Sequence, residues 1–226
     1  YSSMEVFEGY EGDQASLPNR LAADGYFTAF LTSGDLGFLA KGEWLRTLGF
    51  DHIEGHEQAG YAGAKRYGFG AVSDDLLFKR TIDWLKNERP GSQPLAAFVE
   101  TVTTHPPFVS PETGEANEVE TFRFIDRALA DFIGELEELD YFSDGLLIIT
   151  SDQRALTPIS LKELAAFGTA AGARLPLVLI GGQLPSKGLK SSPSQMKDLP
   201  YSLDYYLTAQ ACHRPGQGNM FTGQAP

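Results

Sequence analysis

Two kinds of segment alternate along most of this chain, and their alternation constrains the fold more than any other feature. Short apolar runs rich in Val, Ile, Phe and Leu are separated by longer stretches with apolar residues at helical spacing. Runs of this kind are typical of strands in a parallel sheet, and the stretches between them are long enough for crossover helices. The alternation therefore predicts an α/β fold, with a mostly parallel sheet and helices on both faces.

The strand candidates are the apolar runs at residues 26–31, 95–101, 146–150 and 175–180. The run at 146–150 is continuously apolar and lies between Gly145 and Ser151. Continuous runs are favoured where both faces of a strand are covered. We therefore expect residues 146–150 to form a central parallel strand.

Helix signals flank these runs, and local capping residues mark several of the ends. Ser73 precedes two acidic residues, Asp74 and Asp75, so we expect Ser73 to cap a helix whose dipole the two charges stabilise. Ser160 and Glu163 have the spacing of a capping box. The stretches with helical spacing are residues 17–23, 41–48, 74–85, 118–139 and 201–209, and residues 55–70 and 185–200 read as loops.

Length and charge restrict the organisation and the partners of the chain. With 226 residues and no internal repeat, we expect one domain over residues 1–212 and a Gly/Pro-rich tail over residues 213–226. The net charge of −12 excludes a nucleic-acid partner, because such binding requires clustered Lys and Arg. The sequence contains neither a signal peptide nor an apolar run of about 20 residues that could span a membrane.

Polar residues that follow strands are the candidates for a functional site, because ligands bind beyond the carboxyl ends of strands in open α/β sheets. Asp35 follows the first strand and His105 the second, while Asp152, Gln153 and Arg154 follow the third. A carboxylate held after a strand could ligate a divalent metal, and the prolines after His105 could aim its ring at a substrate oxygen.

Each candidate also has a purely structural explanation. Asp35 and Asp152 occur in sequences that are ordinary in turns. A single histidine such as His105 is more often structural than catalytic. His52 and His56 are four residues apart, but Gly55 lies between them in a predicted loop, so we do not expect the two rings to share a metal.

Six segments in fixed order carry a family resemblance. They read LAADGYFTAFLTSG followed by Asp35, then GFDHIEGH, SDDLLFKRTIDWL, ETVTTHPPF, DRALADFIGELEELDYFSDGLLIITSDQR and ARLPLVLIGG. In this order they resemble the sulfatase-like domain of bacterial lipoteichoic acid synthases and phosphoglycerol transferases, within the alkaline phosphatase superfamily. The resemblance covers most of the chain from Leu17 to Leu207.

The resemblance implies an enzyme that transfers or hydrolyses a phospho- or sulfo-ester through a Thr or Ser nucleophile beside Mn, Zn or Mg. Carried over, Asp152 matches the Asp of an Asp-His metal-ligand pair, and His105 matches a histidine that contacts substrate. Asp35 and Arg154 are the further substrate-binding candidates. Gln153 stands where the family has the metal-binding His, and its neutral amide oxygen is a poor replacement for imidazole.

The family's nucleophile lies upstream of the segment that begins at Leu17, so the resemblance implies that the N-terminal part of the domain is missing from this chain. We therefore expect no catalytic residue here, no metal bound by this chain alone, and either a homo-oligomer or pairing with the missing N-terminal half. The resemblance places the protein at the periplasmic or extracellular face of the cytoplasmic membrane, with an anionic ester of the cell envelope as its substrate.

Three hypotheses remain at this point. In the first, the chain is the C-terminal part of a metal-dependent phosphoglycerol transferase or sulfatase-like hydrolase and is inactive by itself. In the second, it is a non-catalytic sulfatase-like domain that binds an anionic ligand or a protein partner, which explains Gln153 directly. In the third, it is an unrelated doubly wound domain, which the six ordered segments disfavour.

Overall fold

The computed structural model describes residues 16–181, 184, 187–189, 194–208 and 218–222. The chain forms two compact units. The first unit contains the residues up to Leu139 together with Asp152–Leu175. The second contains Asp140–Ser151 and the residues from Pro176 onward.

The first unit is built on a three-stranded parallel sheet with the strand order β2-β1-β3. The central strand β1 (Phe27–Thr32) pairs with β3 (Leu95–Glu100) along its whole length and with the short strand β2 (His52–Glu54). Because all three strands run in the same direction, their carboxyl ends lie at one edge of the sheet. The α/β class with a parallel sheet is therefore confirmed.

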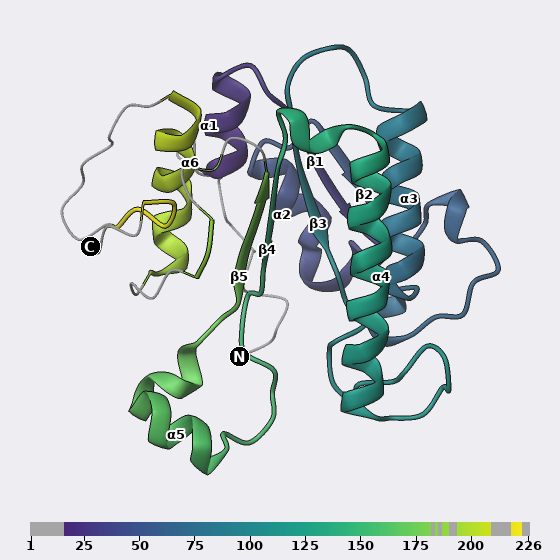
Figure 1. The fold of residues 1–226 in the computed structure, drawn as a ribbon. Helices are drawn as coiled ribbons and strands as arrows, with labels where there is room; N and C mark the ends of the chain where they lie inside the picture. Colours follow the sequence, from purple (N-terminus) through teal and green to yellow (C-terminus); the bar gives the residue numbers. More distant parts are fainter. Residues whose placement is uncertain (1–15, 182–183, 185–186, 190–193, 209–217, 223–226) are drawn as a thin grey trace. The chain divides into compact units, whose positions relative to one another are not determined.

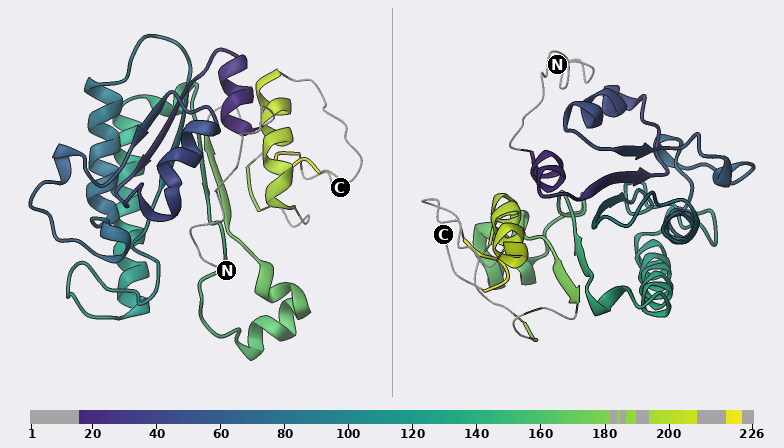
Figure 2. Two further views of the ribbon diagram at one scale, coloured as in Figure 1. Left: turned by 180° about the vertical axis from the view of Figure 1, so that it is seen from behind. Right: turned by 90° about the horizontal axis from the view of Figure 1, so that it is seen from above.

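Helices cover both faces of this sheet. The helices of the unit are α1 (Leu17–Ala23), α2 (Lys41–Thr47), α3 (Asp74–Asn87), α4 (Glu118–Glu138) and α5 (Leu161–Phe167). The side chains of Leu77 and Trp84 on α3 form a buried core with Ala29 and Leu31 of β1. Figure 2 shows α2 and α3 on opposite faces of the sheet.

Helix α4 forms an outer layer against α3 (Figure 1). The rings of Phe78 and Phe132 stack between the two helices with their centroids 4.8 Å apart. Lys86 also forms a 2.9 Å ion pair with Glu135 across the same interface. The long amphipathic stretch predicted at 118–139 thus packs its apolar side against α3.

Capping follows the sequence expectation at some helix ends and departs from it at another. The capping box of Ser160 and Glu163 is present at α5. Ser73 is the N-cap residue of α3, as predicted, but its hydroxyl donates to Asp75 and accepts no helix N–H group. The N–H of Asp74 donates instead to Oγ1 of Thr103, 3.0 Å away, in the segment after β3.

The second unit contains β4 (Leu146–Thr150), β5 (Leu177–Gly181) and α6 (Leu199–Thr208). Strands β4 and β5 pair in antiparallel register, with Leu146 opposite Gly181. The prediction of a central parallel strand at 146–150 is therefore wrong. The apolar run correctly indicated a strand, but apolar composition carries no information on the direction of the partner strand.

Part of the predicted tail packs against α6. Met220 and Phe221 are buried, and the ring of Phe221 lies 5.3 Å from that of Tyr206. The backbone N–H of Met220 donates to the hydroxyl of Ser202 at 2.8 Å. Residues 213–217 and 223–226 of the tail lie outside the described residues, as do Ala209 and parts of the predicted 185–200 loop. The assignment of residues 1–212 to one domain stays a prediction.

No helix within the described ranges is long and apolar enough to span a bilayer.

Candidate functional site

The carboxyl end of β1 leads into a turn that exposes Asp35. The Oδ1 atom of Asp35 accepts a 2.7 Å hydrogen bond from the N–H of Gly37, which fixes the carboxylate over the turn. The side chain is 46% exposed, so its remaining lone pairs are accessible to a ligand. Asp35 therefore stands at the edge of the sheet where the sequence analysis expects a site.

The carboxyl end of β2 brings His56 to the same edge. The backbone N–H of His56 donates to the carbonyl of Gly34 at 3.0 Å, which ties the two strand exits together. The Nδ1 atom of His56 lies 3.4 Å from Oδ1 of Asp35 and 3.7 Å from Oε2 of Glu57. The ring of His56 therefore lies between two carboxylates at this edge of the sheet.

A buried ion pair holds the exit of β2 two residues before His56. Both carboxylate oxygens of Glu54 accept from the guanidinium of Arg80, at 2.8 and 2.7 Å, and both side chains are less than 10% exposed. Burial raises the pKa of Glu54, but hydrogen bonds from His52, Arg80 and Gln58 outweigh it and lower the pKa to about 2. Glu54 is therefore ionised at neutral pH and anchors β2 to α3.

His105 follows β3 at the same edge and is exposed. Its Nδ1 lies 2.7 Å from the carbonyl oxygen of Pro106. Because a carbonyl only accepts hydrogen bonds, this contact places a proton on Nδ1 and leaves Nε2 to face a ligand. The carbonyl of Pro106 thus holds the ring of His105, and the aim of the ring at a substrate oxygen stays a prediction.

Phe69 connects the first of these side chains to the last. Its carbonyl oxygen accepts from the N–H of Asp35 at 2.8 Å, and its ring meets the edge of His105 with centroids 4.8 Å apart. The ring of Phe38 contacts Phe69 in the same way, at 4.9 Å. Phe69 therefore links Asp35 to His105, through its backbone carbonyl and its ring respectively, and Asp35 in turn lies beside His56.

Non-glycine residues with left-handed backbone are concentrated in the segments that carry this group. Among the described residues they are Leu39, Ala40, Phe69 and Phe108 in these segments and Asp140 elsewhere, with φ between 54° and 57°. Such backbone conformations are unfavourable for residues that have a Cβ atom, and they are often retained at binding sites.

An ion pair also joins two elements near this group. Lys41, the first residue of α2, lies 2.7 Å from Glu100, the last residue of β3.

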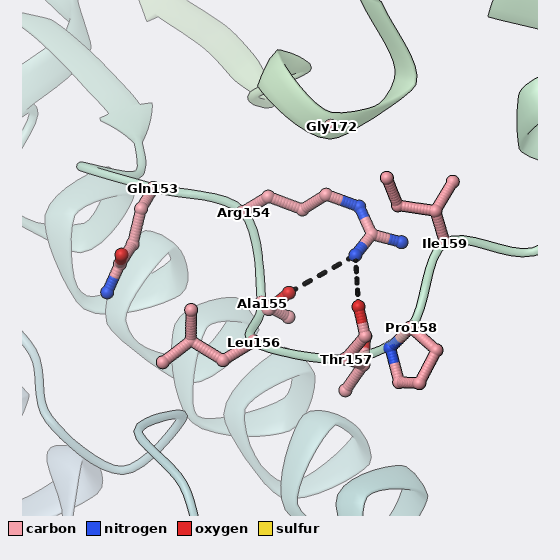
Figure 3. A pocket seen from close by; sticks show the side chains of 8 residues that line it. All are labelled: Gln153, Arg154, Ala155, Leu156, Thr157, Pro158, Ile159 and Gly172. Carbon is pink, nitrogen blue, oxygen red and sulfur yellow. Dashed lines mark hydrogen bonds between the residues drawn. The ribbon is translucent and has the colours of Figure 1, made fainter. Parts of the chain in front are cut away.

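The remaining candidates lie in a separate loop of the first unit, the segment before α5. Asp152 and Gln153 are both exposed. Arg154 donates to the carbonyls of Ala155 and Thr157 at 3.2 and 2.7 Å, as Figure 3 shows, and to Glu163 at 2.8 Å. The guanidinium of Arg154 therefore stabilises the conformation of the loop that carries it. A substrate contact of Arg154 stays a prediction.

This loop forms an open pocket of about 520 Å³. The residues drawn in Figure 3 line it: Gln153, Arg154, Ala155, Leu156, Thr157, Pro158, Ile159 and Gly172. Of these, Arg154 alone is charged, and it donates to two carbonyls of its own loop and to Glu163 on α5. The charged side chain that lines this pocket is therefore already engaged by other groups of the chain.

The side chains in the described ranges do not fit the divalent metal that the family resemblance implies. Asp152 offers a carboxylate, whereas Gln153 offers only a neutral amide oxygen. Within the described part of the chain, no three His, Cys, Asp or Glu side chains are grouped so that they could hold a metal ion. No catalytic step through a metal is derived from these residues.

Sequence reasoning missed His56 and Phe69. His56 was considered only as a partner of His52, but the ring of His52 stacks on Trp84 with centroids 5.2 Å apart and does not join the site. The useful signal was the short HIE segment, which is β2, because His56 follows its end as Asp35 follows β1. Phe69 carried no signal, since its role depends on a loop conformation.

Comparison with known proteins decides the family. The sulfatase family profile matches residues 1–209. The chain belongs to the sulfatase family. It is 29% identical over 165 residues to phosphoglycerol transferase I of Salmonella typhi, which covers 66% of this chain and 21% of that protein. It is also 30% identical over 98 residues to the lipoteichoic acid synthase of Staphylococcus saprophyticus, which covers 38% of this chain and 15% of that one.

Solved structures show the same fold. An alkaline phosphatase superfamily protein from Vibrio parahaemolyticus superposes with a TM-score of 0.71 at 20% identity, over 92% of this chain and 50% of that one. The lipoteichoic acid synthase of Listeria monocytogenes superposes with a TM-score of 0.69 at 18% identity, over 98% and 58%. This sulfatase-like chain thus spans about half of these structures and about a fifth of the curated phosphoglycerol transferase.

Proposed function

We propose that this sulfatase-like chain forms the substrate-binding part of a metal-dependent phosphoglycerol transferase or ester hydrolase that acts on a phospho- or sulfo-ester of an envelope glycan or lipid. The observation that supports this function best is the convergence of Asp35, His56 and His105 at the carboxyl ends of three parallel strands. The proposed location is the outer face of the cytoplasmic membrane.

The three side chains suit different parts of such a substrate. A protonated His105 or His56 donates to the anionic oxygens of the ester, and the hydrogen bonds are strengthened by charge. Asp35 is an acceptor only, so it binds hydroxyl groups of a glycerol or sugar moiety and orients the ring of His56. A net charge of −12 makes such local cationic donors necessary for an anionic substrate.

The chain is proposed to bind the ester without cleaving it. Cleavage in this superfamily generally uses divalent metal ions, and the described residues do not supply a suitable set of ligands. A nucleophile and the remaining ligands are proposed to come from outside this chain, either from the rest of a longer protein or from a second chain.

A ligand titration tests this proposal. We expect sn-glycerol 1-phosphate to shift the imidazole NMR signals of His56 and His105 in a saturable way, and inorganic sulfate to compete. The variant His105→Ala should weaken binding by roughly 10-fold or more, which corresponds to the loss of a charge-assisted hydrogen bond.

The matched control is His52→Gln, because His52 has the same side chain but stacks on Trp84. This control should retain the affinity of the parent protein, provided that its thermal unfolding shows a folded chain. Equal losses of affinity in both variants, or no saturable shift in the parent, would contradict a binding role for His105.

A second candidate is a non-catalytic sulfatase-like domain that binds an anionic ligand or a protein. Gln153 favours it, because this residue stands where the family resemblance places a metal-binding His. The variant Gln153→His in the full-length native gene product separates the two. Metal-dependent ester cleavage that appears in this variant supports the enzyme, whereas continued inactivity with intact ligand binding supports the non-catalytic domain.

A further inference from the structure

Asp74 is a fully buried carboxylate at the start of α3, with no exposed surface. Its two oxygens accept hydrogen bonds from two successive backbone N–H groups after β3. Oδ1 accepts from Val102 at 2.9 Å, and Oδ2 accepts from Thr103 at 3.0 Å. A carboxylate suits two adjacent donors because both of its oxygens are acceptors, whereas an amide side chain would direct its NH₂ group at one of them.

A third hydrogen bond runs in the opposite direction. The backbone N–H of Asp74 donates to Oγ1 of Thr103 at 3.0 Å. Asp74 and the segment after β3 are therefore joined by three reciprocal hydrogen bonds. This arrangement satisfies an otherwise unpaired N–H group at the start of α3, and it fixes the backbone of residues 102 and 103.

The same segment carries His105. The N–H of His105 donates to the carbonyl of Val102 at 2.9 Å, and the N–H of Phe108 donates to the carbonyl of His105 at 3.1 Å. The residue whose N–H is held by Asp74 therefore accepts, through its own carbonyl, the N–H of His105. A displacement of Val102 is transmitted to His105 through a single hydrogen bond.

We infer that Asp74 is a positioning residue for His105, and that its buried carboxylate sets where the imidazole stands relative to Phe69 and Asp35. This inference rests on the proposed function, since it assigns Asp74 a part in the binding of the ester. Asp74 itself has no exposed surface with which to touch a ligand. It acts through Val102 and Thr103.

Burial and hydrogen bonding act in opposite directions on the charge of Asp74. Burial raises the pKa of Asp74 to about 6, and the hydrogen bonds from Val102 and Thr103 oppose this rise. Its charged neighbour on α3 is Asp75, and Glu100 and His105 are the titratable groups on the segment from β3. At neutral pH the carboxylate is ionised and accepts both backbone hydrogen bonds.

The test compares Asp74→Asn with Asp75→Asn, the same substitution one residue later. Asp75 interacts with Ser73 and Lys79 and makes no hydrogen bond to residues 102–105 among its described contacts. In Asp74→Asn we expect the His105 ring signals to shift and the amide exchange of Val102 and Thr103 to accelerate by roughly 10-fold. The affinity for sn-glycerol 1-phosphate should fall by roughly 10-fold as well.

In Asp75→Asn all three quantities should stay at the values of the parent protein. If Asp74→Asn lowers thermal stability but leaves the His105 ring signals and the affinity unchanged, Asp74 is structural only and the inference is wrong. Should Asp74→Asn fail to fold, Thr103→Val removes one of the three hydrogen bonds and is judged by the same ring signals.

These readouts separate the two claims. If the parent protein does not bind sn-glycerol 1-phosphate at all, the proposed function fails, but the His105 ring signals still report whether Asp74 positions this residue. If the parent protein binds and the ring signals do not respond to Asp74→Asn, only the positioning inference fails.

Discussion

The Nδ1 atom of His56 lies 3.4 Å from the Oδ1 atom of Asp35, although the two residues follow different strands. The contact exists because β1 and β2 are parallel neighbours, so their carboxyl ends open at the same edge of the sheet. A hydrogen bond from the backbone N–H of His56 to the Gly34 carbonyl holds the two exits together. The proximity of Asp35 and His56 therefore depends on the order and direction of the strands in the sheet.

Removing one partner of the buried ion pair beneath His56 should destabilise the protein strongly. The variant Arg80→Leu leaves the carboxylate of Glu54 buried without its guanidinium, which we expect to lower the free energy of unfolding by about 3–5 kcal/mol. The control Lys79→Gln removes an exposed partner of Asp75 on the same helix. It should change the free energy of unfolding by less than about 0.5 kcal/mol. Urea unfolding measures both, and similar values for the two variants would contradict the role of this pair.

The interface between α3 and α4 should depend on one aromatic contact. Phe132 is 7% exposed and stacks on Phe78, so Phe132→Ala should lower the free energy of unfolding by about 3–5 kcal/mol. Phe122 lies on the same helix but is 41% exposed, and Phe122→Ala should have an effect of about 1 kcal/mol or less. Chemical denaturation distinguishes the two, and an equal loss in both would show that α4 does not pack on α3 through Phe132.

The strands and helices were largely predictable from sequence because their signals are local. The helix at 17–23 and the strand at 146–150 have the predicted bounds. The helix predicted at 118–139 ends one residue earlier, at Glu138. In a layered fold, the buried side of each helix or strand is apolar. The spacing of the apolar residues therefore indicates which kind of element each segment forms.

The site was predictable only in part, because strand pairing and loop conformation depend on distant residues. Asp35 and His105 are candidates from sequence because each comes a few residues after a recognisable strand. The antiparallel pairing of β4 with β5 was not predicted, because an apolar run has the same composition whether its partner strand is parallel or antiparallel. The hydrogen bonds between Asp74 and Thr103 were also not predicted, since the two residues are distant in sequence.

Asp74 should give the stability of the protein a distinctive dependence on pH. Its pKa is about 6 in the folded protein and near 3.8 in the unfolded chain, so between these values the folded state holds a proton that the unfolded state releases. The free energy of unfolding should therefore fall by about 2 kcal/mol from this group as the pH rises from about 4 to 6.

The measurement is urea unfolding of the parent protein and of Asp74→Asn at a series of pH values from 4 to 7. The slope assigned to Asp74 should be missing in the variant, whatever its absolute stability. An identical slope in both proteins would show that Asp74 titrates similarly in the folded and unfolded states.

The most direct test of the central claim is a double-mutant cycle on the affinity for sn-glycerol 1-phosphate, with the variants His56→Ala, His105→Ala and the pair. If both rings contact one ester group, each single variant should bind roughly 10-fold more weakly, and the double variant should depart from the sum of the two effects by at least about 0.5 kcal/mol. Affinities unchanged in both single variants, or effects that add without any coupling, would contradict a single binding site at the carboxyl ends of β1, β2 and β3.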